Sequence, residues 1–212
     1  MFTGIIEDIG KVHSIVQGPN TMELTISSSK ILSDIHLGDS IAVNGVCLTV
    51  TSFSDKYFTV DVMPETVKST SLQSLTAGSH VNLERAMSAN GRFGGHFVSG
   101  HVDGTGIIIK KRPVANAVYI DIAISEALSE YCLLKGSITI DGTSLTIFDL
   151  QPQQLTVSLI PHTYRETVLG MKKEREPVNI ETDLLGKYII NQFKGRQKSS
   201  SLTMDFLHQH GF

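Results

Sequence analysis

Residues 40–50 read Ser40-Ile41-Ala42-Val43-Asn44-Gly45-Val46-Cys47-Leu48-Thr49-Val50, and residues 137–147 repeat this pattern as Ser137-Ile138-Thr139-Ile140-Asp141-Gly142-Thr143-Ser144-Leu145-Thr146-Ile147. The two stretches lie 97 positions apart, and the same offset aligns residues 58–66 with residues 155–163. Residues 2–6 align with residues 98–102 at an offset of 96, which requires one single-residue insertion or deletion. Because chance rarely keeps one register over several separated segments, we interpret the chain as a tandem duplication.

The repeat divides the chain into two units and a tail. A period near 100 residues matches a small domain and is too long for a solenoid repeat. We therefore expect one barrel-like unit over residues 1–96 and a second over residues 97–187, joined near a cluster of glycines. Residues 188–212 are expected to form a C-terminal helix and tail. The apolar stripe of this helix begins just after Asp183, which can cap its N-terminus, and the helix needs a partner surface on a barrel or another subunit.

Each unit is predicted to be all-β. Val46, Leu48 and Val50 alternate with polar residues, which is typical of a strand with one buried face. The dipeptides Asn44-Gly45 and Asp141-Gly142 predict type I′ turns, because both central positions of that turn need a positive φ. Many short strands separated by turns indicate a closed antiparallel barrel or a sandwich.

The composition excludes several classes of protein. The 212 residues include 18 lysines and arginines against 21 aspartates and glutamates, so no basic excess favours nucleic acid. The two cysteines, Cys47 and Cys132, cannot build a disulfide framework or a four-thiolate zinc site. No signal peptide and no membrane-spanning apolar run is visible. We therefore expect a cytoplasmic protein with no membrane and no nucleic-acid partner.

The polar faces of two equivalent strands are the first candidate site. We expect Val46, Leu48 and Val50 to fill the barrel. Cys47 and Thr49 then point away from the core, and Ser144 and Thr146 do the same in the second unit. Such a row of hydroxyl or thiol groups suits a small neutral ligand with many hydrogen-bonding groups. The alternative is that these side chains only hydrate the outer face of a strand.

The second candidate is the glycine-rich stretch over residues 94–106. It lacks the context of a dinucleotide or phosphate-binding loop. Its histidines, His96 and His101, are five positions apart, and this odd spacing on a strand is poor for sharing a metal. We interpret His96 as a capping or packing residue. His101 replaces Ile5 of the first unit, and a titratable group in one repeat only is expected where a site transfers a proton.

At these residues the chain closely resembles the riboflavin synthase family. The matching motifs are residues 1–6, 44–50, 94–102, 141–146 and 159–163, in the family's order. The resemblance implies two six-stranded antiparallel barrels and a C-terminal helix that helps to assemble a homotrimer, with active sites between subunits. It implies that two molecules of 6,7-dimethyl-8-ribityllumazine exchange a four-carbon unit, giving riboflavin and 5-amino-6-ribitylamino-uracil without cofactor or metal. Lumazine synthase is a further candidate partner.

The resemblance also implies the residues of two substrate sites, one for each lumazine. The first lumazine is expected to contact Gly4, Ile5, Ile6, Cys47, Leu48, Thr49, Asp61, Val62, Met63, Pro64, Glu65 and Thr66, with Ser40 as a further candidate. The second is expected to contact Gly100, His101, Val102, Ser144, Leu145, Thr146, Leu159, Ile160, Pro161, His162, Thr163 and Tyr164, with Lys135 reaching in from a partner chain.

In the expected mechanism, no single side chain supplies most of the rate acceleration. His101 is the candidate general base for the acidic C7 methyl group, with Ser144 and Thr146 as relay partners. Cys47 or a water is expected to add at C7 of the other lumazine. Asp183 either supports the site or only caps the helix. Alignment of the two reactants is expected to supply most of the acceleration, because effective molarities reach about 10⁵–10⁸ M.

Three other functions are alternatives to this interpretation. The nearest is a non-catalytic lumazine- or flavin-binding antenna protein, in which the second-half site has been lost. A flavin-binding barrel of an oxidoreductase needs a nicotinamide-binding domain, for which the chain has no room. A purely structural trimer leaves the polar strand faces without a purpose. The presence of His101, Ser144 and Thr146 favours the enzyme.

Overall fold

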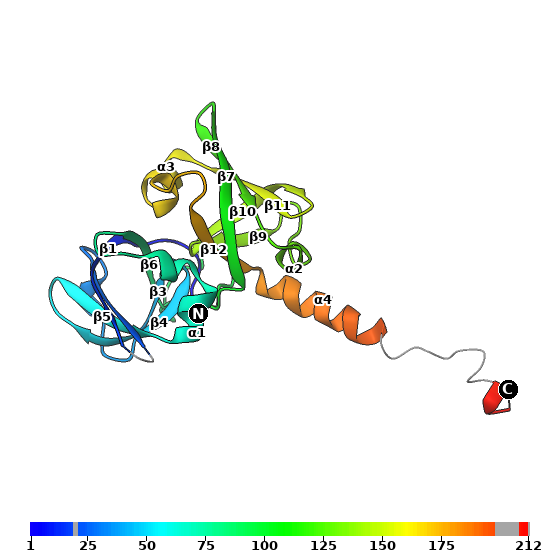
Figure 1. The fold of residues 1–212 in the computed structure, drawn as a ribbon, viewed down its shortest axis with the longest axis horizontal. Coiled ribbons are helices and arrows are strands. Elements are labelled where there is room, and N and C mark those ends of the chain that lie inside the picture. The colour runs from blue at the N-terminus through cyan, green and yellow to red at the C-terminus, as the bar shows by residue number, and fades with distance from the viewer. Residues whose placement is uncertain (19–20, 198–207, 212) are drawn as a thin grey trace.

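The computed structural model describes residues 1–18, 21–197 and 208–211, and it forms two closed six-stranded barrels with a projecting helix (Figure 1). The first barrel contains β1 (Asp8–Gln17), β2 (Met22–Ser27), β3 (Ser40–Val43), β4 (Val46–Phe53), β5 (Tyr57–Val62) and β6 (His80–Arg85). The second contains β7 (Gly104–Val114), β8 (Ala117–Ala123), β9 (Ser137–Ile140), β10 (Thr143–Gln151), β11 (Gln154–Leu159) and β12 (Pro177–Thr182). Short helical pieces between the strands are η1 (Leu32–Asp34), α1 (Pro64–Ser69), η2 (Ser71–Ser74), α2 (Glu126–Ser129), α3 (Pro161–Arg165) and η3 (Val168–Gly170).

The two barrels share one topology. Around the first barrel the strand order is β1-β2-β5-β4-β3-β6, and around the second it is β7-β8-β11-β10-β9-β12, with every pair antiparallel. The first strand of each barrel carries a bulge at the same place, between Val12 and Ser14 and between Ile108 and Lys110. These bulges bend the strand and help the sheet to close. The all-β duplicated fold predicted from the sequence is therefore confirmed. Of the two architectures that the strand pattern allowed, a barrel and a sandwich, the structure has the barrel.

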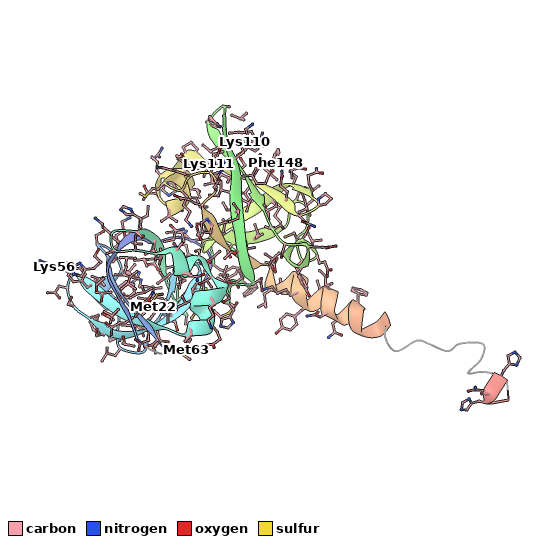
Figure 2. The ribbon with its side chains drawn as sticks, in the orientation of Figure 1. Met22, Lys56, Met63, Lys110, Lys111 and Phe148 are labelled. Atoms are coloured by element: carbon pink, nitrogen blue, oxygen red, sulfur yellow. The ribbon has the colours of Figure 1, made fainter. Side chains whose placement is uncertain are left out.

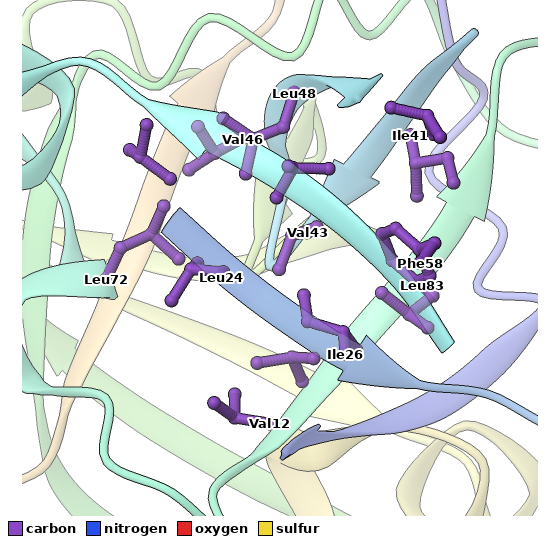
Figure 3. Close-up of a cluster of buried hydrophobic side chains, with 14 of the residues drawn as sticks. Val12, Leu24, Ile26, Ile41, Val43, Val46, Leu48, Phe58, Leu72 and Leu83 are labelled. Atoms are coloured by element: carbon purple, nitrogen blue, oxygen red, sulfur yellow. The ribbon is translucent and has the colours of Figure 1, made fainter. Parts of the chain in front are cut away.

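Alternation along the strands fills each barrel. Val46, Leu48 and Val50 are buried in the first barrel, whereas Thr49 between them is exposed. Figure 3 shows Val46 and Leu48 meeting apolar side chains of the other strands in the barrel interior. Burying a side chain of this size contributes roughly 1.5–3 kcal/mol, so the inward face of each strand sets its register.

The two barrels meet at their tight turns. Asn44 and Gly45 have φ values of 46° and 80°, and Asp141 and Gly142 have 46° and 78°, as expected for type I′ turns. A Cβ atom on Gly45 would lie 2.7 Å from the backbone nitrogen of Gly142, and the reverse substitution would collide equally. The same glycines thus serve the turn conformation and the close approach of the two barrels.

A reciprocal pair of buried asparagines joins the barrels next to these turns. Asn82 donates to the carbonyl of Asp141 at 2.9 Å, and Asn179 donates to the carbonyl of Asn44 at 2.8 Å. The side-chain oxygens of the two asparagines accept backbone N–H groups of Val168 and Ser71 from the opposite unit. Because buried polar groups are costly when unpaired, these bonds fix how the two units pack.

The C-terminal helix, α4 (Leu184–Gln197), projects away from both barrels (Figure 1). The Asp183 carboxylate accepts the backbone N–H of Leu185 at 3.0 Å, which confirms the predicted cap. The C-terminal helix and tail were expected to begin at residue 188, but α4 begins four residues earlier, at Leu184. Strand β12 ends at Thr182, so only Asp183 separates the strand from the helix. Leu185, Tyr188, Ile189 and Phe193 are exposed, so the apolar stripe is not covered by its own barrels. Residues 198–207 and 212 of the expected tail lie outside the described residues.

Among the described residues, no helix combines the length and the apolar character that crossing a membrane requires.

The contact between the turns predicts a difference between two glycine substitutions. Gly38→Ala is expected to cost about 1–2 kcal/mol, because its φ is also left-handed but open space surrounds it. Gly45→Ala is expected to cost a further 1–3 kcal/mol, roughly, from the collision with Gly142. Urea unfolding of both variants measures the difference. Equal losses of stability would contradict the importance of the close approach.

Candidate functional site

Two equivalent strand faces carry the predicted polar residues. Cys47 and Thr49 lie on the outer face of β4, and Ser144 and Thr146 lie on the outer face of β10. Cys47 and Ser144 are half-buried, whereas both threonines are exposed. The alternation predicted from the sequence is therefore present in both barrels.

A glycine-containing segment crosses over each of these strand faces. The backbone N–H of Cys47 donates to the carbonyl of Gly100 at 2.9 Å, and that of Ser144 donates to the carbonyl of Gly4 at 2.7 Å. Both glycines have left-handed φ values, and a Cβ on either would lie 2.6 Å from the Cβ of the residue it covers. Only glycine allows the segment to lie this close to the strand.

The crossing connects each segment to the opposite barrel. Gly4 precedes the first barrel but lies on β10 of the second, while Gly100 precedes the second barrel but lies on β4 of the first. Phe2 and Val98 pair between the two segments through backbone bonds of 2.8 and 3.2 Å. The Phe2 and Val98 side chains are fully buried there and pack against Cys47.

This arrangement corrects the grouping expected from the sequence. Gly4, Ile5 and Ile6 were expected beside Cys47, but their segment lies on the strand of Ser144. Residues 100–102 were expected beside Ser144, but they lie on the strand of Cys47. The repeat aligned equivalent positions correctly, yet alignment within one unit carries no information about an exchange of segments between units.

A buried carboxylate holds each crossing segment. Glu84 on β6 accepts the N–H and hydroxyl of Thr3 at 2.7 and 2.8 Å and the N–H of Gly4 at 3.0 Å. Glu181 on β12 makes the equivalent bonds to Ser99 and Gly100, at 2.7, 2.7 and 3.0 Å. Burial raises the pKa of Glu84, and its hydrogen bonds from Thr3 and Gly4 oppose that shift.

The remaining predicted residues of the first site surround β4. Ser40 is paired with Thr49 in the β3–β4 register, and Val50 opposite Val60 brings the end of β5 alongside Leu48. Residues 61–66 follow from that end of β5 into α1. Met63, which precedes α1, is exposed at the edge of the barrel (Figure 2).

In the second unit, the equivalent residues surround β10 in the same way. Ile147 opposite Val157 brings the end of β11 alongside Leu145, and residues 159–164 continue from it into α3. Ile160 is exposed at the position equivalent to Met63. Lys135 has a left-handed φ of 66°, and its ammonium group lies 4.4 Å from the ring centre of Phe148, which Figure 2 labels on the same barrel.

His96 contacts Ser144, which the interpretation of the sequence did not anticipate. Its Nδ1 lies 2.7 Å from the hydroxyl of Ser144, and its backbone N–H donates to the carbonyl of Thr3. Burial lowers the pKa of His96, and the nearby carboxylate of Asp183 partly counteracts this. His96 is therefore mainly neutral near pH 7 and can accept a proton through Ser144. It lies outside the aligned residues 98–102, so the repeat gave no signal for it.

His101 lies on the other strand face. It follows Gly100, whose carbonyl is bound by Cys47, and its own backbone N–H donates to the hydroxyl of Ser99 at 3.1 Å. The His101 side chain is exposed. Within one chain, the two histidines thus serve different strand faces, His101 that of Cys47 and His96 that of Ser144.

Both strand faces are open in the single chain. Ile5, Met63, Phe97 and Ile160 next to them are between 45% and 61% exposed. A hollow of about 470 Å³ lies against the first barrel, between β3, β6 and the N-terminal segment; Ile5 and Ser40 line it, but neither Cys47 nor Ser144 does. In the part of the chain that the structure describes, no group of three histidines, cysteines or acidic residues could hold a metal.

Comparison with known proteins identifies both units. The lumazine binding domain family matches residues 3–86 and 99–183. The riboflavin synthase of Bacillus subtilis is 56% identical over 215 residues, and that of Actinobacillus pleuropneumoniae is 55% identical over 216, each match covering all of both chains. The riboflavin synthase of Saccharomyces cerevisiae is 43% identical and covers 91% of this chain and 86% of its own length.

Solved structures agree with the sequence relatives. The crystal structure of LumP complexed with 6,7-dimethyl-8-(1'-D-ribityl) lumazine has a TM-score of 0.78 and 26% identity. The complex of LumP with riboflavin has a TM-score of 0.80, also with 26% identity. Each covers 86% of this chain and 99% of its own.

The two cysteines are predicted to differ in reactivity. Burial raises the pKa of Cys132 to about 11, so its thiol stays protonated and slow to react until the solution approaches that pH. Cys47 is half-buried at the open strand face and is expected to react with iodoacetamide first at pH 8. Mass spectrometry of peptides measures both rates, with Cys47→Ser as control. Faster labelling of Cys132 than of Cys47 would contradict this accessibility.

Proposed function

The chain belongs to the riboflavin synthase family, and on this premise we propose that it converts two molecules of 6,7-dimethyl-8-ribityllumazine into riboflavin and 5-amino-6-ribitylamino-uracil. The reaction is a transfer of a four-carbon unit between two copies of one substrate. The enzyme is a transferase (EC 2.5.1.9).

The duplicated strand face is the observation that carries this proposal. Cys47 with Thr49 and Ser144 with Thr146 occupy equivalent outer positions, and each pair is crossed by a glycine segment. A reaction between two identical molecules needs two similar binding faces, which a duplicated barrel supplies. Each face offers backbone groups for the imide edge of a pyrimidine ring and hydroxyl or thiol groups for a ribityl chain.

We assign the individual contacts as part of the same proposal. The first lumazine binds over Cys47, Leu48 and Thr49, between Ser40, residues 61–66 and the segment 100–102 that crosses β4. The second binds over Ser144, Leu145 and Thr146, between residues 159–164 and the segment 4–6 that crosses β10. Lys135 reaches in from a partner chain.

We also propose a homotrimer with active sites between subunits. The open strand faces support it, since a small ligand needs a more enclosed site than either face provides alone. The exposed apolar stripe of α4 supports it as well, because such a surface is typical of a subunit contact. In this proposal residues 1–96 and 97–187 are the two binding units, and residues 188–212 serve assembly. The protein works in the cytoplasm, with lumazine synthase as a candidate partner.

The chemistry requires loss of a proton from the C7 methyl group of one lumazine and activation of the other. His101 is one candidate base, and its place beside Cys47 serves the first lumazine. The 2.7 Å contact of His96 with Ser144 makes this pair a second candidate base, serving the second lumazine. If His96 is the base, the first lumazine is the acceptor, and Cys47 or a water adds at its C7. If His101 is the base, the acceptor is the lumazine over Ser144, and a water adds at its C7. Asp183 supports the site by acting on His96 through its charge.

Positioning is expected to contribute more than any single base. A well-placed acid–base group accelerates a reaction by about 10²–10⁴, whereas aligned reactants reach effective molarities of about 10⁵–10⁸ M. No cofactor takes part in this scheme, since the C7 anion is delocalised over the lumazine ring.

Incubation of the purified protein with the lumazine alone tests the proposed reaction. We expect riboflavin and the aminouracil to appear in equal amounts without any added cofactor, followed by absorbance and chromatography. Tight lumazine binding without riboflavin formation would instead support a non-catalytic antenna protein.

Two histidine variants identify the base. His96→Gln and His101→Gln keep hydrogen-bonding capacity but cannot accept the proton, so the variant that removes the base is expected to slow a single turnover by about 10²-fold or more. Lumazine affinity, measured by fluorescence titration, should change much less. If both variants retain the wild-type rate, neither histidine is the base, and a substrate or solvent group must accept the proton.

A further inference from the structure

A carboxylate two residues beyond His101 ties its segment to the C-terminal helix. Asp103 accepts the N–H and hydroxyl of Thr182 at 2.8 and 2.9 Å. The ammonium group of Lys187 lies 2.7 and 2.6 Å from its two carboxylate oxygens. Thr182 is the last residue of β12, and Lys187 stands in the first turn of α4. Asp103 therefore connects the end of the crossing segment with both the barrel and the helix.

In the first unit, the equivalent carboxylate is bound without any contribution from a helix. By the repeat, Glu7 is equivalent to Asp103, and Arg85 is equivalent to Thr182. Arg85 donates its backbone N–H and its Nε to the Glu7 carboxylate, each at 2.8 Å. One residue of β6 thus supplies both the backbone bond and the positive charge. In the second unit threonine supplies only the neutral bonds, and the cation comes from α4.

The different source of the cation in the second unit affects the segment that lies over Cys47. Between Ser99 and Asp103 the chain is bound at one end by Glu181 and at the other by Thr182 and Lys187. His101 and the carbonyl of Gly100 lie between these two attachments. The Lys187 and Asp103 side chains are 20% and 27% exposed, so water screens their attraction only partly.

We propose that Lys187 is a positioning residue for the site at Cys47. Through Asp103 it fixes the segment that carries Gly100 and His101, so that α4 contributes to the geometry of this site. The segment over Ser144 depends instead on Arg85 of its own barrel. The inference rests on the proposed function for its kinetic consequence, but its structural consequence is measurable without any turnover.

The experiment compares Lys187→Met with Lys187→Arg in the full-length protein. Methionine keeps the length and helix propensity of lysine without its charge, whereas arginine keeps the charge and can pair with a carboxylate. Arg85→Met is the matched control, because it removes the equivalent cation from the other segment. Sedimentation and thermal unfolding verify that each variant is assembled and folded at the assay temperature.

The first readout is the rate at which iodoacetamide labels Cys47. Loosening the Gly100 segment uncovers this thiol, so Lys187→Met should increase the rate about three-fold or more, while Lys187→Arg and Arg85→Met stay near wild type. Equal rates in Lys187→Met and wild type would overturn the proposal, and so would an equal increase in Arg85→Met. Neither result depends on whether the protein forms riboflavin.

The second readout separates kcat from KM for the lumazine. A misplaced catalytic segment lowers turnover more than affinity, so Lys187→Met should lower kcat by about 3–10-fold with KM changed less than two-fold, and Lys187→Arg should restore most of it. An unchanged kcat in Lys187→Met would overturn the positioning role while leaving the proposed function intact. Failure of the wild type to form riboflavin would instead overturn the proposed function.

Discussion

A buried carboxylate that accepts three hydrogen bonds from the opposite end of its unit fixes each crossing segment. Glu84 binds Thr3 and Gly4, and Glu181 binds Ser99 and Gly100. A carboxylate buried without partners would be strongly destabilising, so these donors and acceptors depend on one another. Once the segments are held, Gly4 must lie on β10 and Gly100 on β4, and both candidate sites follow from this placement.

The exchange of segments makes each site a product of both units. Each polar strand face comes from one barrel, and the glycine segment over it leads into the other. The reciprocal asparagine bonds and the abutting turns hold the barrels at the separation that the exchange needs. Neither barrel alone would therefore present a complete binding face.

Duplication has left the two sites similar in framework and different in chemistry. Cys47 stands where the second unit has Ser144, and Ile5 stands where it has His101. His96 is bound to Ser144, and the cation beside each segment comes from Arg85 in one unit and from α4 in the other. Two identical substrates with unequal roles, one donor and one acceptor, require such differences.

The sequence by itself determined the duplication, the all-β character, the type I′ turns at Asn44 and Asp141, and the outward direction of Cys47 and Ser144. The duplication is visible because the same pattern recurs 97 positions later. The other features are local, since they depend on a two-residue alternation and on the φ values that a turn allows. Only the tertiary structure decided that the segments are exchanged, that His96 meets Ser144, and that Lys187 binds Asp103. Each of these contacts joins residues far apart in the chain, and no periodicity or propensity encodes which distant surface a segment will cover.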